Sequence, residues 1–389
     1  MKILQVFSSI DPAGGGLAAC YKALTPALTN LGCQCECVCV DDPQARFLPT
    51  MPGPIHPQGP PNGGYRYSSH LLPWLRAHAK NYDTVIVHGL WQYHGVAVHR
   101  ALSRTRGTRY FVFSHGMLDP WFQRQYPVKH LKKLVYWWLI ERRVLRDAAA
   151  VLFTCEEERN LAQHAFPGFK HRERIVTLGT TAPEGDPEIQ REAFFLLLPN
   201  LRGTPFWLFF GRIHVKKGID LLIDAYAQLS RSVGHPLPDL VIAGPCADSG
   251  YLQALKTRAA ESCPTGKVQW PGMISGPAKW GILRAAEIFI LPSHQENFGM
   301  AVAEALACGT PVLLSDKVNI WREIKGDGAG LVESDTAVGT ISLLERWMQL
   351  APQGRAAMAA AATKCYTTRY EIQASAQSLV AVLGEPSLS

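Results

Sequence analysis

The sequence lacks any apolar run that approaches the roughly 20 residues of a membrane-spanning helix. Residues 1–16 carry one lysine and a short apolar stretch without a small-residue cleavage site, so we expect a first strand and its loop there, not a signal peptide. No phosphate loop ending in G-K-S or G-K-T occurs. These absences argue against a membrane-spanning protein, a secreted protein and a P-loop enzyme.

The ten cysteines follow no disulfide framework. Four of them alternate as Cys33, Cys35, Cys37 and Cys39. A metal or redox site would usually carry a second ligand pair with C-x2-C spacing, which is missing. A strand with small, buried residues on one face explains the alternation better. Unpaired cysteines then predict a reducing, cytoplasmic compartment.

The composition is that of a folded chain, with 47% apolar and 18% charged residues. Its 389 residues suit two domains of ordinary size better than a single core. The net charge of +7 lies wholly in the first half, where residues 1–187 hold 21 Lys and Arg against 14 Asp and Glu. Because this excess is local and no recognised binding motif accompanies it, we expect no nucleic-acid partner.

Short apolar strands alternate with helical stretches, which predicts an α/β fold with parallel sheets covered by helices on both faces. The strands expected in the first half lie at residues 3–7, 38–40, 84–88, 110–114 and 150–154. Those expected in the second half lie at residues 207–210, 240–243, 288–291 and 312–314. A loop rich in Pro and Gly is expected at 41–65, and a linker at 180–187. The pattern predicts two doubly wound, Rossmann-like halves.

The strongest functional pattern follows the expected strand at 288–291. A Pro-Ser turn leads to Glu296, then to Asn297-Phe298-Gly299, and then to a helix that begins near Met300. Gly299 allows a ligand to approach the backbone closely. The unpaired N–H groups and the positive dipole end of the helix suit a phosphate.

Two carboxylates accompany that helix start. Glu296 beside it suits sugar hydroxyls, and Glu304, two turns further on, suits ribose hydroxyls, because hydroxyl-to-carboxylate hydrogen bonds are charge-assisted and directional. Two glutamates eight residues apart also occur on solvated helix edges. Here the helix is apolar on nearly every side, so we expect Glu304 to be buried and to need a partner.

A second pattern, FFGRIHVKKG at residues 209–218, directly follows a strand. Gly211 lets the chain turn, and Arg212 and Lys217 then present two cations at the carboxyl end of that strand. Such cations could neutralise a departing diphosphate; a basic surface turn is the alternative interpretation. A third pattern, the glycine-rich residues 8–16, lies between the first strand and helix, where phosphates approach such folds, but it does not match G-x-G-x-x-G.

These three segments, in this order along nearly the whole chain, resemble the retaining glycosyltransferases of family 4, which have the GT-B fold. The continuation ALACGTPV at residues 305–312 is also similar to the family. The resemblance implies two Rossmann-like domains facing a cleft. Residues 1–185 would form an acceptor-side domain, on which a C-terminal helix at about 368–389 packs back. Residues 186–367 would form the domain that binds the nucleotide sugar.

The resemblance also implies roles for single residues. Arg212 and Lys217 would hold the donor diphosphate, Glu296 would contact the donor sugar, and Glu304 would contact the ribose. The remaining donor-binding residues that it implies are Gly15, Gly16, Met273, Ile274, Asn297, Phe298, Gly299 and Met300, of which Met273 and Ile274 belong to a base-contacting loop at 270–274.

The first half adds the segment SHGMLDPW at residues 114–121, which follows a strand. A lone histidine in such a place is often structural. The resemblance implies that His115 faces the reacting sugar, so His115 joins Glu296 as a candidate catalytic residue. His88, at the end of a neighbouring strand, and Asp119 are candidates for the acceptor side, although Asp119 could equally cap the following turn.

Taken together, the resemblance implies an enzyme that moves a sugar, with retention, from a nucleoside-diphosphate sugar to a saccharide or lipid-linked acceptor. A UDP-sugar is favoured, and exopolysaccharide or cell-envelope glycan synthesis is the expected setting. No cofactor or metal is expected, because no Asp-x-Asp pair occurs. The alternatives are a nucleotide-sugar epimerase of the same fold and a catalytically silent nucleotide-sugar-binding protein; a phosphorylase would need a pyridoxal-phosphate lysine context that is not evident.

The basic excess of the first half concentrates at residues 124–146. Seven cations accompany a single acid, Glu141; the cations are Arg124, Lys129, Lys132, Lys133, Arg142, Arg143 and Arg146. Leu131, Leu134, Val135, Trp138 and Leu139 fall among them at helical spacing. This pattern fits a peripheral helix on the inner face of an anionic membrane, or a core-facing helix with an ordinary solvated side.

Overall fold

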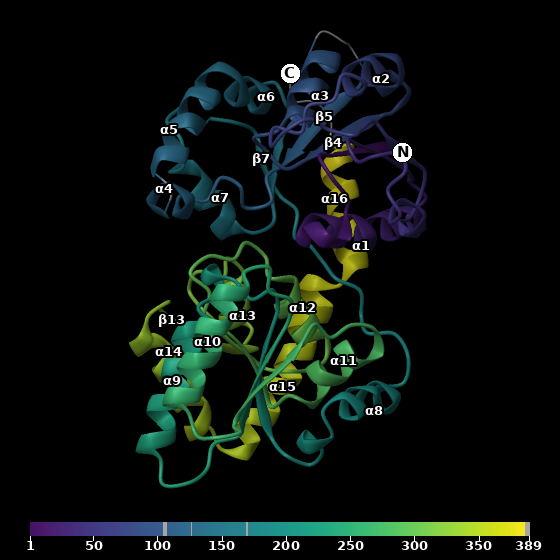
Figure 1. Cartoon of the computed structure of the whole chain (residues 1–389). Helices are drawn as coiled ribbons and strands as arrows, with labels where there is room; N and C mark the ends of the chain where they lie inside the picture. Colours follow the sequence, from purple (N-terminus) through teal and green to yellow (C-terminus); the bar gives the residue numbers. More distant parts are fainter. Residues whose placement is uncertain (104–106, 126, 169, 386–389) are drawn as a thin grey trace. The chain divides into compact units, whose positions relative to one another are not determined.

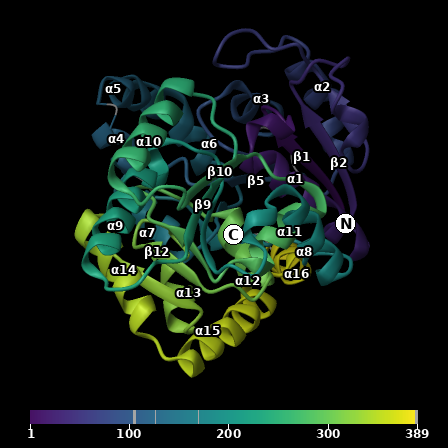
Figure 2. The same ribbon diagram turned by 60° about the horizontal axis from the view of Figure 1, so that its bottom comes forward.

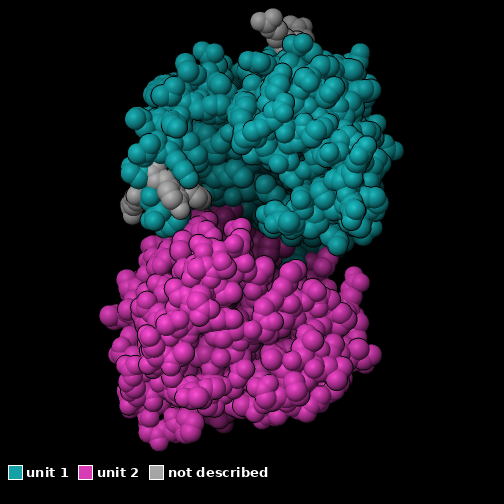
Figure 3. Space-filling model, viewed as in Figure 1, with its two compact units in different colours: residues 1–180, 372–389 teal, residues 181–371 magenta. Residues whose placement is uncertain are grey.

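A computed structural model describes residues 1–385 apart from 104–106, 126 and 169. The chain forms two compact units, one made of Met1–Thr180 with Ile372–Ser389 and the other of Thr181–Glu371 (Figure 3). No helix among the described residues is both long and apolar enough to cross a bilayer. The predicted α/β class with two doubly wound, parallel sheets is confirmed.

The first unit is built on a seven-stranded parallel sheet with the order β3-β2-β1-β4-β5-β6-β7. Its strands are β1 (Lys2–Phe7), β2 (Gln34–Cys39), β3 (Ile55–Pro57), β4 (Thr84–His88), β5 (Arg109–Phe113), β6 (Val151–Phe153) and β7 (Glu173–Ile175). The first strands are rich in β-branched and apolar residues, as fits a sheet buried on both faces.

Helices cover both faces of this sheet (Figure 1). The helices of this unit are α1 (Gly16–Asn30), α2 (Leu71–His78), α3 (Tyr93–Leu102), α4 (Trp121–Gln125), α5 (Pro127–Tyr136), α6 (Arg142–Arg146), α7 (Glu156–Gln163) and α16 (Ile372–Gly384). Short helical turns are η1 (Pro12–Gly14), η2 (Leu48–Thr50), η3 (Ala79–Asn81) and the π-helical η4 (Trp137–Glu141). Cys37 and Cys39 on β2 pack with Tyr21 of α1 in one core cluster. All four alternating cysteines are buried and unpaired, which confirms the strand interpretation.

The second unit has a six-stranded parallel sheet with the order β10-β9-β8-β11-β12-β13. Its strands are β8 (Phe206–Phe210), β9 (Asp239–Ala243), β10 (Val268–Gly272), β11 (Ile288–Leu291), β12 (Val312–Ser315) and β13 (Gly330–Glu333). The order reverses between β8 and β11, and ligands of doubly wound sheets bind beyond the carboxyl ends of strands at such a point.

Two groups of helices flank this sheet (Figures 1 and 2). One group contains α9 (Ile219–Ser232), α10 (Ser249–Ser262) and α14 (Ala337–Gln349). The other contains α8 (Pro187–Leu197), α11 (Gly276–Ala285), α12 (Met300–Ala307) and α15 (Pro352–Cys365). The remaining elements are α13 (Trp321–Gly326), η5 (Pro199–Leu201), η6 (Val215–Lys217) and the π-helical η7 (Tyr366–Tyr370).

The last helix, α16, belongs to the first unit although it follows α15 of the second. It packs on α1, the hydroxyl of Ser375 donates to the carbonyl of Thr177 at 2.6 Å, and the N–H of Ile372 donates to the carbonyl of Thr180 at 3.2 Å. The end of the helix expected at about 368–389, residues 386–389, lies outside the described residues.

Four strands were not expected from the sequence. The loop predicted at residues 41–65 contains the edge strand β3, whose Pro57 is tolerated because edge strands need not donate every N–H. Trp270 and Pro271, assigned to a loop, belong to the other sheet's edge strand β10. The short edge strands β7 and β13 were also missed. Short edge strands carry little apolar periodicity, so the pattern of residues does not reveal them.

The contact between α8 and α11 offers a test of the fold. A Cβ on Gly281 of α11 would overlap the backbone carbonyl of Gln190 in α8. Gly281→Ala should therefore destabilise the protein by about 1–3 kcal/mol, as overpacked cores do, and lower the melting temperature in calorimetry. Gly354→Ala on α15, where a Cβ meets only ordinary contacts, is the matched control and should leave stability equal or slightly higher. Equal melting temperatures for the two variants would contradict this packing.

Candidate active site

The chain leaves β8 through a turn that exposes a cation. Gly211 has a φ of +153°, and Arg212 after it is exposed. A Cβ on Gly244, at the end of neighbouring β9, would overlap the carbonyl oxygen of Gly211. Glycine at 244 therefore allows the ends of the two strands to approach closely enough to form this turn.

A second close approach joins the ends of β8 and β11. Gly218 has a φ of +62°, and a Cβ there would overlap the carbonyl oxygen of Pro292. The N–H of His294 donates to the carbonyl of Lys216 at 2.8 Å. These contacts place the Lys216-Lys217 corner beside the loop that follows β11.

At this corner Lys217 forms an ion pair with Glu296. Their side chains are 16% and 20% exposed, so the pair is largely shielded from water. Beside it, Lys216 donates to the side-chain oxygen of Gln295 at 2.6 Å. The backbone of Glu296 is fixed as well, because its N–H donates to the carbonyl of Lys317 and its carbonyl accepts from the N–H of Asn319, each at 2.9 Å.

The cations control the charge of Glu296. Burial alone would raise the pKa of Glu296, but Lys217 above all, and then Lys216 and Arg212, outweigh it and hold the pKa below its ordinary value. Glu296 is therefore an ionised acceptor surrounded by three cations. The structure thus brings Arg212, Lys217 and Glu296 together, although they lie about 80 residues apart in the sequence.

The loop then turns into α12 through Gly299, which has a φ of +74°. No side chain caps this helix start, so its first N–H groups stay available to a ligand. Phe298 is buried and meets Tyr370 edge to face, with ring centroids 5.5 Å apart, so it can offer only its backbone. The side chain of Asn297 accepts from Asn319 at 3.2 Å.

Glu304 lies on α12 and pairs with Lys279 of α11, at 2.6 Å. Its side chain is 12% exposed, and burial raises the pKa of Glu304 although Lys279 opposes that rise. Glu304 is thus the nearly buried, partnered acid that the apolar helix predicted. Lys279 was not expected, because nothing in the sequence indicates which cation α11 turns toward α12.

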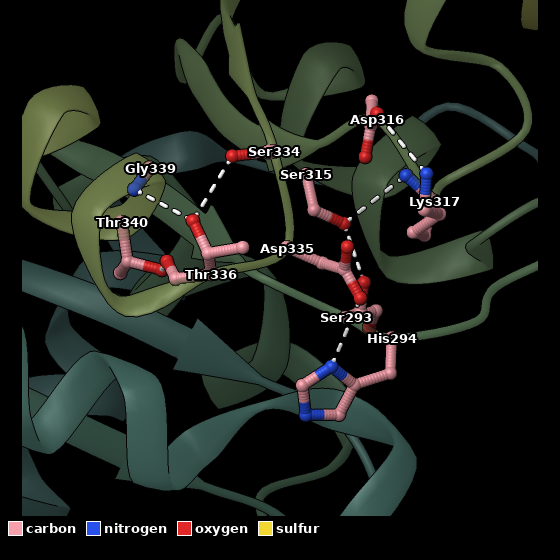
Figure 4. A network of polar contacts seen from close by, with 10 residues as sticks. All are labelled: Ser293, His294, Ser315, Asp316, Lys317, Ser334, Asp335, Thr336, Gly339 and Thr340. Carbon is pink, nitrogen blue, oxygen red and sulfur yellow. Dashed lines mark hydrogen bonds and ion pairs between the residues drawn. The ribbon is translucent and has the colours of Figure 1, made fainter.

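A network of polar contacts ties the ends of the next strands together (Figure 4). Ser315 at the end of β12 donates to the carbonyl of Ser293 after β11 at 2.5 Å. The ring of His294 points at Asp335, with 3.1 Å between Nδ1 and Oδ2. The N–H of Asp316 donates to the carbonyl of Glu333 on β13 at 2.8 Å. The Glu296 loop therefore rests on a fixed support.

The proposed base-contacting loop follows β10. Met273 is 71% exposed and Ile274 only 5%. Of these two side chains, the one that a ligand can reach in this conformation is Met273.

In the first unit, a buried carboxylate orders the glycine-rich loop that contains Gly15 and Gly16. Asp41, after β2, accepts from the hydroxyl of Ser9 at 2.6 Å and from the N–H of Ile10 at 2.9 Å. Arg66 pairs with the same carboxylate at 3.0 Å. Gly15 has a φ of +84° and precedes α1 without any side-chain cap. Sequence reasoning had assigned Asp41 only to a loop rich in Pro and Gly.

Two of the candidate residues in this unit touch. His88 Nδ1 and His115 Nε2 lie 2.9 Å apart, so one ring donates a proton to the other. Burial lowers the pKa of His115 to about 3 and, with His115 and His94 nearby, holds the pKa of His88 well below its usual value. Both rings are therefore neutral. The ring of His88 stacks on Phe7, with centroids 4.1 Å apart.

Sequence reasoning missed Glu158, the residue that holds the loop around His115. The carboxylate of Glu158 is buried on α7 and accepts from Ser114, Gly116 and Thr154. Three consecutive glutamates, 156–158, begin this helix, and the sequence alone does not indicate which of them turns inward.

Asp119 accepts from the N–H of Trp121 at 2.8 Å, as expected of a turn cap. It also lines a pocket of about 60 Å³ with Met117, Gln123, Lys129, His130, Lys133 and Phe166. Among the residues that the structure describes, no group of three or more His, Cys, Asp or Glu side chains is arranged to hold a metal ion.

Each half of the chain matches a model of a known protein family. Residues 15–179 match the model of a glycosyl transferase 4-like domain, and residues 198–364 match that of the glycosyl transferases group 1. D-inositol 3-phosphate glycosyltransferases are similar: that of Jonesia denitrificans is 29% identical over 202 residues, or 50% of this chain and 47% of that protein. That of Nocardia farcinica is 31% identical over 196 residues, 49% and 43% of the two chains. The chain thus matches about half the length of these relatives.

Solved structures agree on the fold. Sucrose-phosphate synthase from Thermosynechococcus elongatus has a TM-score of 0.74 at 19% identity, covering 98% of both chains. Anabaena Alr3699/HepE in complex with UDP and glucose has a TM-score of 0.77 at 17% identity, covering 98% of this chain and 99% of that one. The fold is therefore that of the GT-B class. The chain belongs to the group 1 glycosyltransferases and carries a glycosyl transferase 4-like domain in its first half.

The ion pair at the corner predicts a pH dependence. Because the pKa of Glu296 is lower in the folded than in the unfolded chain, the pair stabilises the protein above the unfolded value of about 4.3 and loses this effect as the pH falls through the folded pKa. Lys217→Met should raise the pKa of Glu296, measured by NMR titration of its carboxyl carbon. The variant should lose stability near neutral pH, and its difference from the native protein should shrink in acid. Lys217→Arg keeps the cation and is the control; an unshifted Glu296 in Lys217→Met would contradict the pairing.

Proposed function

We propose that this protein is a retaining glycosyltransferase that takes a sugar from a nucleoside-diphosphate sugar bound by Thr181–Glu371 and delivers it to a saccharide or lipid-linked acceptor. The observation that carries this proposal is the cluster of Arg212, Lys217 and Glu296 beside the uncapped start of α12. Cations next to unpaired helix N–H groups suit a diphosphate, and an ionised acid beside them suits the hydroxyls of the attached sugar.

In this proposal Arg212 and Lys217 bind the diphosphate of the donor. Lys217 is already paired with Glu296, so the pair is preformed and needs little reorganisation when charge develops on the leaving diphosphate. The dipole of α12 adds positive potential at its first turn. Glu304 accepts from the ribose hydroxyls, and the backbone at 297–300 contributes N–H donors. Met273 and the backbone of Ile274 contact the base.

The chemical step follows from these assignments. The anomeric carbon loses its bond to the diphosphate, and the acceptor oxygen attacks from the same face. The departing phosphate oxygen takes the acceptor proton, so no separate protein base is needed. We assign His115 to the reacting sugar, Gly15 and Gly16 to the donor phosphate, and His88 and Asp119 to the acceptor side, in a first domain that binds the acceptor; these roles rest on the family resemblance.

UDP is the nucleotide that we favour, because Anabaena Alr3699/HepE, which shares the fold, was solved with UDP-glucose. A role in exopolysaccharide or cell-envelope glycan synthesis is the setting we propose. WaaG, a glycosyltransferase involved in lipopolysaccharide biosynthesis, shares the fold at a TM-score of 0.67 and 17% identity.

Donor binding can be tested by thermal shift with a panel of nucleotide sugars. A donor at about 100 times its Kd should stabilise the folded protein by about 2.7 kcal/mol, and we expect a UDP-sugar to do so. Glu304→Ala should weaken donor affinity roughly 10- to 100-fold, the cost of losing hydrogen bonds to a charged group. Glu287→Ala is the matched control, since Glu287 also pairs with a cation, Arg355, but precedes β11 at the opposite end of the sheet. Unchanged donor affinity in Glu304→Ala would contradict the assignment.

The same assay separates the rival functions. A transferase releases nucleoside diphosphate from the stabilising donor when an acceptor, or slowly water, is present. An epimerase returns a changed nucleotide sugar without release, and a silent binding protein returns the donor unchanged. Either of the last two results would overturn the transferase proposal while leaving the donor site in place.

We further propose that the surface of α5 and η4 contacts an anionic membrane. Five apolar side chains follow one side of these helices and are strongly exposed; they are Val128, Leu131, Val135, Trp138 and Leu139. On the opposite side, Trp137 is fully buried against Phe166. The ordinary solvated side of a core-facing helix would be polar, whereas this side is apolar with exposed Lys129, Lys132 and Arg143 beside it. The side chain of Arg124 and residue 126 lie outside the described residues.

Sedimentation with liposomes tests this surface. The native protein should pellet with vesicles that contain an anionic lipid and less with neutral ones, because the cations add about 1 kcal/mol each near a charged surface. Leu131→Glu should reduce pelleting. Leu196→Glu is the matched control: Leu196 on α8 is 78% exposed against 65% for Leu131, but α8 carries two acids, Glu188 and Glu192, against one base, Arg191. Equal pelleting of both variants would contradict a membrane contact through α5.

A further inference from the structure

A single buried carboxylate ties together three segments of the first unit. One oxygen of Glu158 accepts from the hydroxyl of Ser114 at 2.6 Å and from the N–H of Gly116 at 2.5 Å. The other oxygen accepts from the N–H and the hydroxyl of Thr154, both at 2.7 Å. Four donors therefore compensate the burial of this acid, which is 3% exposed.

The residue between two of these donors is His115, and its backbone is strained. Its φ is +49°, in the left-handed region that residues other than glycine seldom adopt. Such a conformation costs on the order of 1–3 kcal/mol and persists only where the surroundings impose it. Glu158 holds the residue before and the residue after His115, so it imposes this conformation from both sides.

The strained backbone determines where the imidazole lies. The ring stacks on Phe113, with centroids 4.4 Å apart, and its Nε2 meets Nδ1 of His88 at 2.9 Å. A relaxed loop would release both contacts, because they follow from the direction in which His115 leaves the chain. His88 itself is fixed independently, by its stacking on Phe7 and by the strand that it ends.

We propose that Glu158 is the positioning residue of the first unit, which fixes the Ser114–Gly116 turn so that the His115 ring is held against His88 in the orientation used for sugar transfer. The part that concerns transfer rests on the proposed function through His115. The part that concerns the ring does not depend on any substrate. A merely structural role, joining the end of β5 to α7, would leave the ring orientation and its proton unchanged when Glu158 is altered conservatively.

The first experiment reads the ring directly by long-range ¹H–¹⁵N NMR of the histidine side chains, assigned with His88→Gln and His115→Gln variants. In the native protein one proton is shared between the two rings, so each has a single tautomer. Glu158→Gln replaces one carboxylate oxygen with an amide donor that faces two of these four donors, and it should convert His115 to a mixture of tautomers with loss of the hydrogen bond between the rings. A folded Glu158→Gln protein whose His115 and His88 signals are unchanged would overturn the proposal.

Glu141→Gln is the matched control. Glu141 is equally buried in the same unit, and burial raises its pKa to about 8, so glutamine replaces an acid that is largely neutral at pH 7. The His115 signals should not move in this variant. If Glu158→Gln fails to fold, Ser114→Ala removes only one of the four bonds and should shift the signals in the same direction by less; unchanged signals there would count against the proposal.

The second experiment measures steady-state turnover of a donor that the native protein uses. Glu158→Gln should lower kcat by on the order of 10- to 100-fold, the effect of misplacing a group by about 1 Å, with the donor KM unchanged. Glu158→Asp, which keeps the carboxylate, should recover part of the loss. If the native protein turns over no donor, the proposed function fails while the NMR result still decides the positioning role. An unchanged kcat with displaced ring signals would exclude the link to transfer.

Discussion

The ion pair between Lys217 and Glu296 is the interaction on which the candidate donor site depends. It connects the loop after β8 with the loop after β11, the two strands between which the strand order of the sheet reverses. It forms only because Gly218 lets the backbone meet Pro292. Without the cation, a largely buried carboxylate would have to take up a proton or a new partner, and the start of α12 would lose the acid beside it.

The same principle recurs in the first unit with different chemistry. Asp41 holds the glycine-rich loop and is balanced by Arg66, whereas Glu158 holds the His115 turn with hydroxyl and backbone donors alone. In each case a carboxylate in the segment that follows one strand fixes the loop after a neighbouring strand. Doubly wound folds need such ties, because the loops at the carboxyl ends of parallel strands do not hydrogen-bond to one another as the strands do.

The sequence predicted the strands and motifs that its local pattern encodes. Central strands such as β4 and β11 are short apolar runs. The motifs after the strands, which resemble those of glycosyltransferase family 4, contain Arg212, Lys217, Glu296 and Glu304. The residues that support the candidate sites could not be predicted from local patterns. Lys279, Asp41 and Glu158 act on segments 25 to 44 residues away along the chain, and their side chains resemble those of ordinary surface residues until the sheet brings them inside. Edge strands β3, β7 and β10 were missed because they are short and only partly buried. The edge strand β13 was missed because its four residues, GLVE, show too little of an apolar pattern.

Helix α5 shows most clearly why periodicity has limits. The apolar residues at 131, 134 and 135 of α5 and at 138 and 139 of the following η4 look like a single core-facing stripe, and a helical wheel drawn from the sequence does not show which side meets the core. In the structure Leu134 packs toward the core whereas Leu131, Val135 and Leu139 turn outward. Trp137 decides the orientation, since its indole fills the core beside Phe166 and donates to the carbonyl of Pro167 at 3.0 Å. Leu134, Tyr136 and Ile140 pack on the same core. The buried indole with its hydrogen-bond partner stabilises this orientation together with them, and the other apolar side chains are left on the outside.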